Sequence, residues 1–224
     1  MIIPNQTHQS ELLVSSFLEM VNTTDGNFTV VAKLIEASND DESMQLTIEH
    51  LCLYPQAKQA FTNRLRLGTI DLDRMSKLAV NTLGRLYADH IIQNQLKPIQ
   101  SELQPQSERD FLNVHITETH DIWHVVTGTN IDVLGEIQLE AFYIAQLKMS
   151  RFWLALMTKN LLKSLLYDIE MADRYLEIIT KGWMMGHQAQ PLFGVNWSNL
   201  WETPIEEVRA SLKISILKMA PELR

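Results

Sequence analysis

Apolar residues recur three and four positions apart over most of this chain, and that spacing is the feature that most restricts its fold. The pattern runs through residues 11–22, 28–37, 43–53, 71–92, 108–127, 131–147, 150–167 and 169–185. Alternation with a period of two, which a half-buried strand requires, is nowhere sustained. We therefore expect an all-α protein, a compact bundle-like arrangement of roughly eight to ten helices with short connections.

The length of 224 residues favours one domain. The polar, proline-bearing segment 97–107 is the best candidate for a boundary, but each half alone would make a thin core. We therefore expect a single helical domain over residues 1–224. The aromatic-rich segment 186–201 is interpreted as a structured loop before a last helix, which Thr203 could cap together with Glu206.

Charge and cysteine content exclude some classes of protein. A net charge of −8 argues against a nucleic-acid binder, whose affinity would come from neutralising phosphates with Lys and Arg. Cys52 is the sole cysteine, which fits a reducing compartment. The first residues show neither signal-peptide nor transit-peptide character, and no apolar run reaches the ~18 residues that span a bilayer. We expect a cytoplasmic location.

Capping signals define two consecutive helices in the most informative stretch, residues 107–142. Ser107 with Asp110 is a plausible cap for the first helix, and Gly128 is a natural residue to end it. Thr129 with Asp132 could cap the second helix immediately afterwards. Helices joined by so short a link must fold back near each other.

Two imidazoles and two carboxylates would converge at this link. His120 and His124 are four residues apart and share one helix face, with Asp121 on its flank, while Glu136 lies early in the second helix. Imidazole suits Zn, Fe and Ni, whereas carboxylate suits Mg and Mn, so the set does not choose one metal. The alternative is a solvated helix, on which two histidines at this spacing are common.

The pattern His120-Asp121-x-x-His124, followed after eleven residues by Glu136 within Leu134-Gly135-Glu136, resembles the signature of the coenzyme Q biosynthesis protein 4 family. Weaker similarity extends over about 71–217, through Leu83-Gly84-Arg85 with Tyr87 and through Trp201-Glu202. The family link usually contains Pro-Thr-Asn, where this chain has the residues 129–133, Thr-Asn-Ile-Asp-Val. The spacing is kept, so the resemblance implies the same ligands.

The resemblance also implies a function. Family members are helical proteins of ubiquinone biosynthesis, attached peripherally to a membrane, often dimeric, with a divalent metal at this motif. They organise the biosynthetic complex and carry out oxidative decarboxylation at ring carbon 1 of a prenylated hydroxybenzoate. By resemblance we expect Zn or Mg, with Fe or Mn also compatible. The expected partners are a prenylated quinone precursor, other quinone-biosynthesis enzymes, a membrane surface and a second copy of the chain.

Residues 141–167 contain four cations and no acidic residue, which gives this stretch a local charge of +4. A basic, aromatic and apolar helix is typical of a membrane-surface element. The alternative is a buried core helix whose lysines extend outwards. The candidates for lipid or membrane contact are Phe152, Trp153, Leu156, Lys159 and Lys163.

Other residues near the motif have simpler interpretations. We expect Glu140 and His115 to be solvated, although Glu140, one turn beyond Glu136, could also be a carboxylate that supports the metal site or binds a second metal. We expect Trp123 and Phe142 to be packing residues beside the site. Cys52 is expected to be a buried small hydrophobe. Two other functions remain open, a metal-dependent phosphohydrolase on a helical bundle and a non-catalytic lipid-binding scaffold. The first would need further His and Asp ligands on other helices.

Overall fold

The computed structural model describes residues 4–23, 27–38, 41–148 and 150–216. Regular structure in these residues is helical, apart from one isolated bridge between Thr82 and Pro204. The α-helices are α1 (Pro4–Val21), α2 (Phe28–Ser38), α3 (Asp41–Leu51), α4 (Pro55–Asn63), α5 (Leu72–Met75), α6 (Leu83–Gln93), α7 (Glu108–Thr127), α8 (Val133–Leu147), α9 (Arg151–Tyr167), α10 (Ala172–Gln188) and α11 (Ile205–Ser211). Two 3₁₀ helices are η1 (Ile169–Met171) and η2 (Trp197–Leu200). The prediction of an all-α fold is confirmed.

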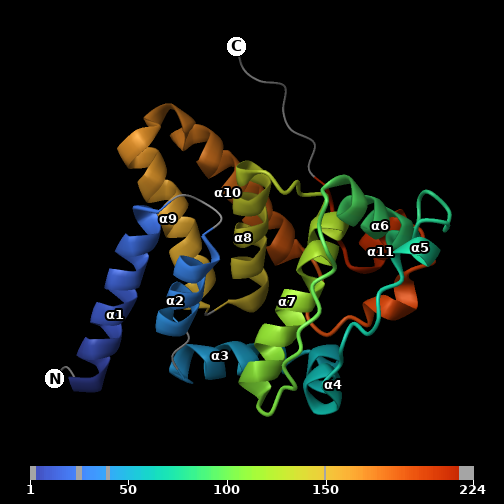
Figure 1. Cartoon of the computed structure of the whole chain (residues 1–224), viewed down its shortest axis with the longest axis horizontal. Coiled ribbons are helices and arrows are strands. Elements are labelled where there is room, and N and C mark those ends of the chain that lie inside the picture. Colours follow the sequence, from blue (N-terminus) through green and yellow to red (C-terminus); the bar gives the residue numbers. More distant parts are fainter. Residues whose placement is uncertain (1–3, 24–26, 39–40, 149, 217–224) are drawn as a thin grey trace.

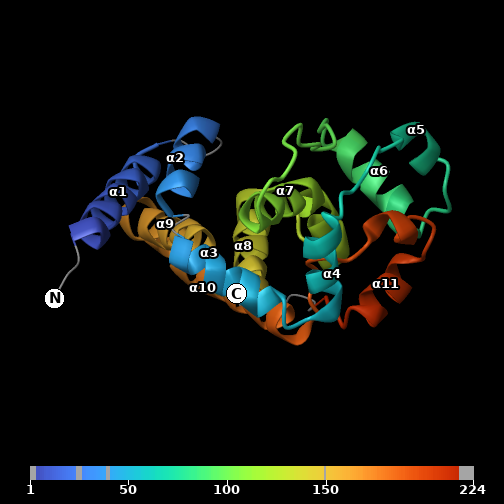
Figure 2. The same cartoon turned by 90° about the horizontal axis from the view of Figure 1, so that it is seen from below.

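The helices form two groups on either side of α8 (Figures 1 and 2). On one side α9 packs on α8, and α1 and α2 pack on α9. On the other side α7 leads to α6, α5 and α11. Helix α10 returns antiparallel to α9 and packs along α8. The C-terminal half of α7 and the first turn of α8 therefore lie between the two groups, while most residues of the link that joins them are exposed.

The close approach of α8 and α10 depends on two glycines one turn apart. A Cβ at Gly182 would collide with the Gln138 carbonyl oxygen, and one at Gly186 would lie 2.7 Å from the Phe142 carbonyl oxygen. Because neither glycine has a side chain, the two backbones pack directly. This contact fixes the axis of α8, the helix that carries Glu136.

Buried apolar residues form two clusters of very different size. The larger cluster draws on α3 to α8, α10, α11 and the segment 189–201, with Phe111, Phe142 and Trp197 almost fully buried. The smaller cluster consists of Met20, Val30, Leu34 and Leu156, with partly buried neighbours around them. The layer of α1, α2 and α9 is therefore packed on the body through a thin core.

Several local predictions differ from the structure. The periodic stretch 71–92 is interrupted, because Asp71 caps the short α5 and Thr82 caps a separate α6. Helix α4 was not predicted. Thr203 does not cap α11, because the N-cap position is Pro204 and no side chain caps the helix. The Thr203 carbonyl instead accepts from the Leu83 backbone N–H at 2.9 Å.

The predicted connection 97–107 is packed onto the body rather than free. Arg66 donates to the Ser101 carbonyl at 2.7 Å and to Glu118 of α7, and Glu118 also accepts from the Ser101 N–H at 3.1 Å. The Glu118 carboxylate is buried, and bonds to charged groups of this kind are stronger than neutral ones. One domain over residues 1–224 stays a prediction, because both ends lie outside the described residues.

Candidate metal centre

The first helix of the motif begins and ends as predicted. Ser107 and Asp110 form a reciprocal capping box at the start of α7, with the Asp110 N–H donating to the Ser107 hydroxyl at 3.0 Å. Gly128 ends the helix with a φ of +71°, in the left-handed region that favours glycine. Helix α7 therefore presents His120 and His124 one turn apart, near its C-terminus.

The second helix is capped by Asp132 alone. The Gly135 N–H donates to the Asp132 carboxylate at 2.8 Å. Thr129 was predicted as the cap, but its side chain instead faces the His124 ring. Gly135 is required here, because a Cβ would collide with the Asn130 backbone. This tight link turns Glu136, in the first turn of α8, towards α7.

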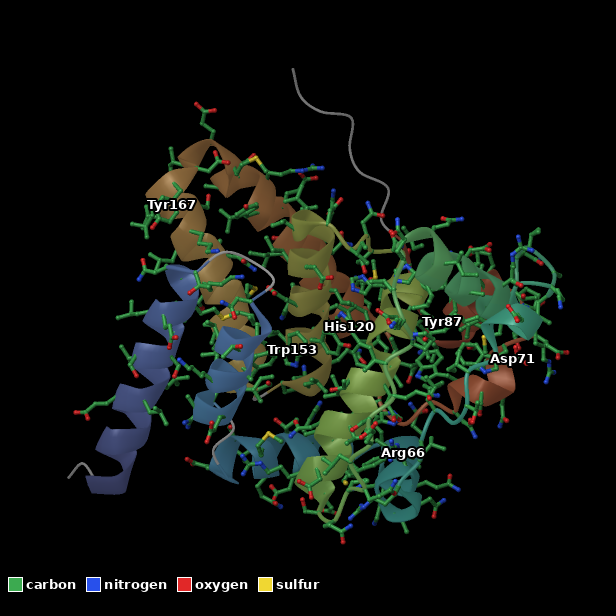
Figure 3. All side chains as sticks on the ribbon, in the orientation of Figure 1. Arg66, Asp71, Tyr87, His120, Trp153 and Tyr167 are labelled. Atoms are coloured by element: carbon green, nitrogen blue, oxygen red, sulfur yellow. The ribbon has the colours of Figure 1, made fainter. Side chains whose placement is uncertain are left out.

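His120, His124 and Glu136 are brought together. The two Nε2 atoms lie 3.3 Å apart, and Glu136 oxygens lie 3.2 Å from His124 Nε2 and 3.9 Å from His120 Nε2. Among the described residues this is the one group of three or more His, Cys, Asp or Glu whose ligand atoms all lie within 4.8 Å of one another. Figure 3 shows His120 in the middle of the molecule.

The outer nitrogens of both rings have partners. His124 Nδ1 lies 3.3 Å from the Thr129 carbonyl oxygen and 3.1 Å from its hydroxyl. A carbonyl oxygen only accepts, so the tautomer that fits this contact has the proton on Nδ1, and a neutral ring in that tautomer has its lone pair on Nε2. His120 Nδ1 lies 3.3 Å from the Tyr143 hydroxyl. Such contacts orient metal-binding histidines.

The electrostatics of the group fit a cation. Burial and then the neighbouring His124 lower the pKa of His120 to about 4, so this ring is neutral at pH 7. Two facing Nε2 atoms beside a carboxylate then present electron pairs to the same small space. The residues present therefore have the chemistry of a divalent metal site.

Asp121 does not join the cluster. It follows His120 directly, so its side chain leaves α7 in a different direction, towards α6. The carboxylate is buried, and burial raises its pKa. The charges of His124 and Glu136 also act on the pKa of Asp121, so its carboxylate is near the cluster. Its oxygens are nevertheless not in the group of ligand atoms that lie within 4.8 Å of one another.

Two cavities meet at His120 and Trp153, which line both. Figure 3 labels these two residues, which lie on α7 and α9. One cavity, of about 320 Å³, is walled mainly by apolar residues of α2, α3, α7, α8 and α9. The other, of about 490 Å³, lies between the α1–α2 pair and α8–α9 and also contains Glu136. A stack of aromatic rings separates them from the core, with Tyr143 centred 4.1 Å from Trp153 and 4.3 Å from Trp123.

The five predicted lipid or membrane contacts lie along this boundary. Phe152 lines the first cavity, and Leu156 and Lys159 line the second. Leu156 and Lys159 are each only 7% exposed, so their side chains lie inside the protein rather than on a surface that a membrane could contact. Lys163 is partly buried and donates to the Thr23 carbonyl at 2.9 Å. These three side chains are buried or partly buried because α1 and α2 cover the face of α9 on which they lie.

Two predictions about neighbouring residues were wrong. His115 is 2% exposed rather than solvated, because α4 and the segment 189–201 cover that side of α7. Its Nδ1 lies 3.1 Å from the Leu65 carbonyl and its Nε2 accepts from the Gly194 N–H at 3.2 Å. Glu140 is also buried, and accepts from Asn160 of α9 at 2.8 Å.

Trp123 and Phe142 are packing residues as predicted. Cys52 is partly buried.

Three further residues at the site, Tyr143, His90 and Tyr87, were not predicted from the sequence. Tyr143 lies seven residues after Glu136, which places it two turns along the same face of α8, and this spacing could have identified it. His90 and Tyr87, which approach the site from α6, lie far from the motif in sequence. The His90 ring stacks on His124 with centroids 5.8 Å apart.

Known proteins resemble this chain in both fold and sequence. The family model for "Coenzyme Q (ubiquinone) biosynthesis protein Coq4" matches residues 2–218. The mitochondrial ubiquinone biosynthesis protein COQ4 of Yarrowia lipolytica is 25% identical over 202 residues, covering 87% of this chain and 74% of the relative. The mitochondrial COQ4 homologue of Aedes aegypti is 25% identical over 159 residues, and the match covers 70% of this chain but 57% of that relative.

A crystal structure of a Nostoc punctiforme protein, described as a ubiquinone biosynthesis protein, superposes with a TM-score of 0.81 at 25% identity. The superposition covers 91% of this chain and 97% of that chain. The Nostoc punctiforme protein therefore resembles this chain in the packing of its helices as well as in sequence.

Fold and site together define an all-helical protein whose two-histidine, one-glutamate cluster lies where two cavities meet. With the family model matched over nearly the whole length, the chain belongs to the coenzyme Q (ubiquinone) biosynthesis protein Coq4 family. No helix among the described residues is long and apolar enough to cross a membrane. The predicted cytoplasmic location stays a prediction.

Proposed function

We propose that this protein of ubiquinone biosynthesis binds one divalent metal ion and a prenylated ring precursor beside it. The observation that carries the proposal is the pair of facing Nε2 atoms of His120 and His124, beside Glu136, at the junction of two cavities. Asp121, buried next to the cluster, is the fourth predicted ligand. We propose Zn or Mg as the ion, with Fe or Mn as the alternatives.

The cavities suit a prenyl chain. Volumes of about 320 and 490 Å³ fall in the range of small-molecule sites. Their walls are mostly apolar, and each buried methylene of a ligand contributes about 0.8 kcal/mol. A tail along the α1–α2 side of His120 would therefore supply most of the affinity.

A polar end of the larger cavity suits the ring. Lys159 and Asn160 line it together with Glu136, so a cation and an amide stand in the same cavity as the metal cluster. A hydroxybenzoate head group carries a carboxylate, for which a buried ammonium is a suitable partner. The ring carboxylate would lie near Lys159, with the tail leaving towards the apolar walls.

The reaction proposed for this site is oxidative decarboxylation at ring carbon 1. The bond from the ring to its carboxyl group breaks, CO₂ leaves, and one oxygen atom of dioxygen becomes the new ring hydroxyl. The other oxygen atom leaves as water, with two electrons and two protons from an external two-electron reductant. A bound metal ion would supply Lewis-acid or redox chemistry, and two histidines with one carboxylate is the donor set of non-haem iron oxygenases. The chain's own part is to orient the ring with Lys159, to hold the imidazoles through Tyr143 and Thr129, and to exclude water with the Trp153 stack.

The competing functions have less support. A phosphohydrolase would need further ligands, and the described residues contain no second metal-binding group of this kind. A non-catalytic lipid-binding scaffold would need the cavities but no cluster of metal ligands opening into them, whereas His120 and Glu136 both line the larger cavity. Binding to other quinone-biosynthesis enzymes and to a second copy of the chain follows from the family alone.

Peripheral membrane attachment is proposed at the end of α9 rather than along its length. Leu165, Leu166, Tyr167 and Ile169 are 53–70% exposed at the turn between α9 and α10, where Figure 3 shows Tyr167 at one extremity of the molecule. Asp168, Glu170 and Asp173 are exposed beside them, so attachment would depend on apolar insertion rather than on anionic lipids.

Metal content tests the proposal directly. The purified protein, equilibrated with Zn²⁺, Mg²⁺, Fe²⁺ or Mn²⁺ in turn, should retain about one ion per chain. The variant His120→Ala/His124→Ala should lose it while keeping its helicity, because the core does not depend on the site. His187→Ala, at an exposed histidine, is the matched control. Equal metal content in all three proteins would contradict the proposal.

Tail length tests the lipid part. Prenylated hydroxybenzoates with longer tails should bind more tightly than the unprenylated acid, and Trp153→Ala should reduce that difference. Equal affinity for short and long tails would show that the cavities do not hold the prenyl chain.

A further inference from the structure

The face of α6 that packs on α7 carries two polar atoms with no partner among the described residues. They are the Tyr87 hydroxyl and His90 Nε2, both buried and without a hydrogen bond. A buried polar atom left unpaired costs about 1–3 kcal/mol. The indole nitrogens of Trp123 and Trp197 are also unpaired, but of these four atoms only His90 Nε2 can be a metal ligand, and a bound ion is one of the partners that satisfy such atoms.

These two residues of α6 lie opposite two residues of α7 at the metal centre, Tyr87 opposite Asp121 and His90 opposite His124. Tyr87 and His90 are three apart on α6, as Asp121 and His124 are on α7. The His90 ring stacks on His124 at an interplanar angle of 23°, and the Asp121 charge acts on the Tyr87 hydroxyl. Helix α6 thus closes the side of the cluster opposite the cavities, neither of which His90 lines.

The ring separations are those of ligands to one ion. A Zn–N distance of about 2.1 Å and a tetrahedral angle place the centroids of two imidazoles about 5 Å apart. His120 and His124 have centroids 4.8 Å apart, and His90 and His124 have centroids 5.8 Å apart. His90 is outside the group of ligand atoms that lie within 4.8 Å of one another, so its side chain would have to turn to bring Nε2 to an ion held by the other two rings.

We propose that His90 is a third imidazole ligand of the metal centre. This inference rests on the proposed metal site and specifies it further: the ion has a donor set of three histidines and Glu136, with Asp121 behind it. Three nitrogen ligands favour Zn²⁺ or Fe²⁺ over Mg²⁺, which prefers oxygen ligands and retains its waters. The site therefore selects a transition metal.

Replacing His90 by Phe tests this assignment. The phenyl ring keeps the stacking on His124 but removes the nitrogen. Affinity for Zn²⁺, measured by competition with a chelator, should fall by at least about 10-fold, while Mg²⁺ affinity changes little. The Co²⁺ absorption spectrum of the loaded protein should change as well, which a purely structural role would not cause.

His50→Phe is the matched control, because His50 is also partly buried and also contacts an aromatic ring, Tyr54, at a centroid distance of 5.8 Å. It lies on α3, outside the cluster, and should leave metal affinity unchanged. Equal Zn²⁺ affinity and equal Co²⁺ spectra in the two variants would overturn the assignment of His90. If the wild-type protein bound no metal, the proposed function itself would fail instead.

A second measurement needs no substitution, in case His90→Phe does not fold. In ¹⁵N-histidine-labelled protein, Zn²⁺ should produce large coordination shifts of the ring nitrogens of His90, His120 and His124. Coordination shifts at only two histidines would equally exclude His90 as a ligand.

Discussion

The two sides of the cavities are built differently. On one side, α6, α7 and α8 hold the candidate ligands within the large core, where Trp123, Phe142 and Tyr143 are fully buried. On the other side, α1, α2 and α9 rest on the body through Met20, Val30, Leu34 and Leu156. A ligand set needs fixed geometry, whereas a prenyl tail needs room and adaptable walls. The chain therefore combines a half with a large core, which holds the candidate metal ligands, with a half packed through a small core, which suits the lipid proposed above.

Truncating one leucine on each side is the strongest way to break this comparison. Leu139 and Leu34 are both 0% exposed, but the first lies in the large core and the second in the small one. Leu139→Ala should cost about 4 kcal/mol of unfolding free energy, whereas Leu34→Ala should cost nearer 2 kcal/mol because its surroundings can collapse. Urea titration measures both. Equal losses would mean that the two sides are equally well packed.

The next largest effect is a loss of stability in acid that originates in the rigid half. Burial lowers the pKa of His115 to about 4 from an unfolded value near 6.5. The unfolded chain then binds the proton first, so stability is full above pH 6.5 and falls as the pH drops towards 4. The total loss is about 3 kcal/mol. Protonation would also break the bond that Nε2 accepts from Gly194.

Urea unfolding at several pH values, compared with His115→Gln, isolates this contribution. The variant should be less stable at pH 7 but should lose less stability between pH 6.5 and 4. Parallel pH profiles in the two proteins would show that His115 is not responsible.

A methyl group at the α8–α10 contact should have an intermediate effect. Gly182→Ala would push α10 away from the Gln138 carbonyl, at a cost of about 1–3 kcal/mol. Because α8 carries Glu136, metal affinity should weaken in parallel. Thr180→Ala, at an exposed position on the same helix, serves as the control. A variant as stable as wild type would mean that the two backbones can separate freely.

The smallest change in stability is expected at the turn between α9 and α10. Leu165→Ser/Leu166→Ser should alter unfolding by less than about 0.5 kcal/mol, because both side chains are exposed. Binding to phosphatidylcholine vesicles should nevertheless fall sharply, and salt should have little influence on it. Unchanged vesicle sedimentation would move the membrane contact elsewhere, for example to the outer face of α1.

Sequence alone determined the helical class and the ends of the motif helices, because periodicity, caps and glycine turns act within a few residues. It also predicted His120, His124 and Glu136 together, since helix spacing and a short link bring them close. The tertiary structure decided the rest. Helices α1 and α2 bury Lys159, helix α4 and the segment 189–201 bury His115, and α6 places His90 against His124. Burial depends on which distant element covers a face, and no local pattern along α6, α7 or α9 contains that information.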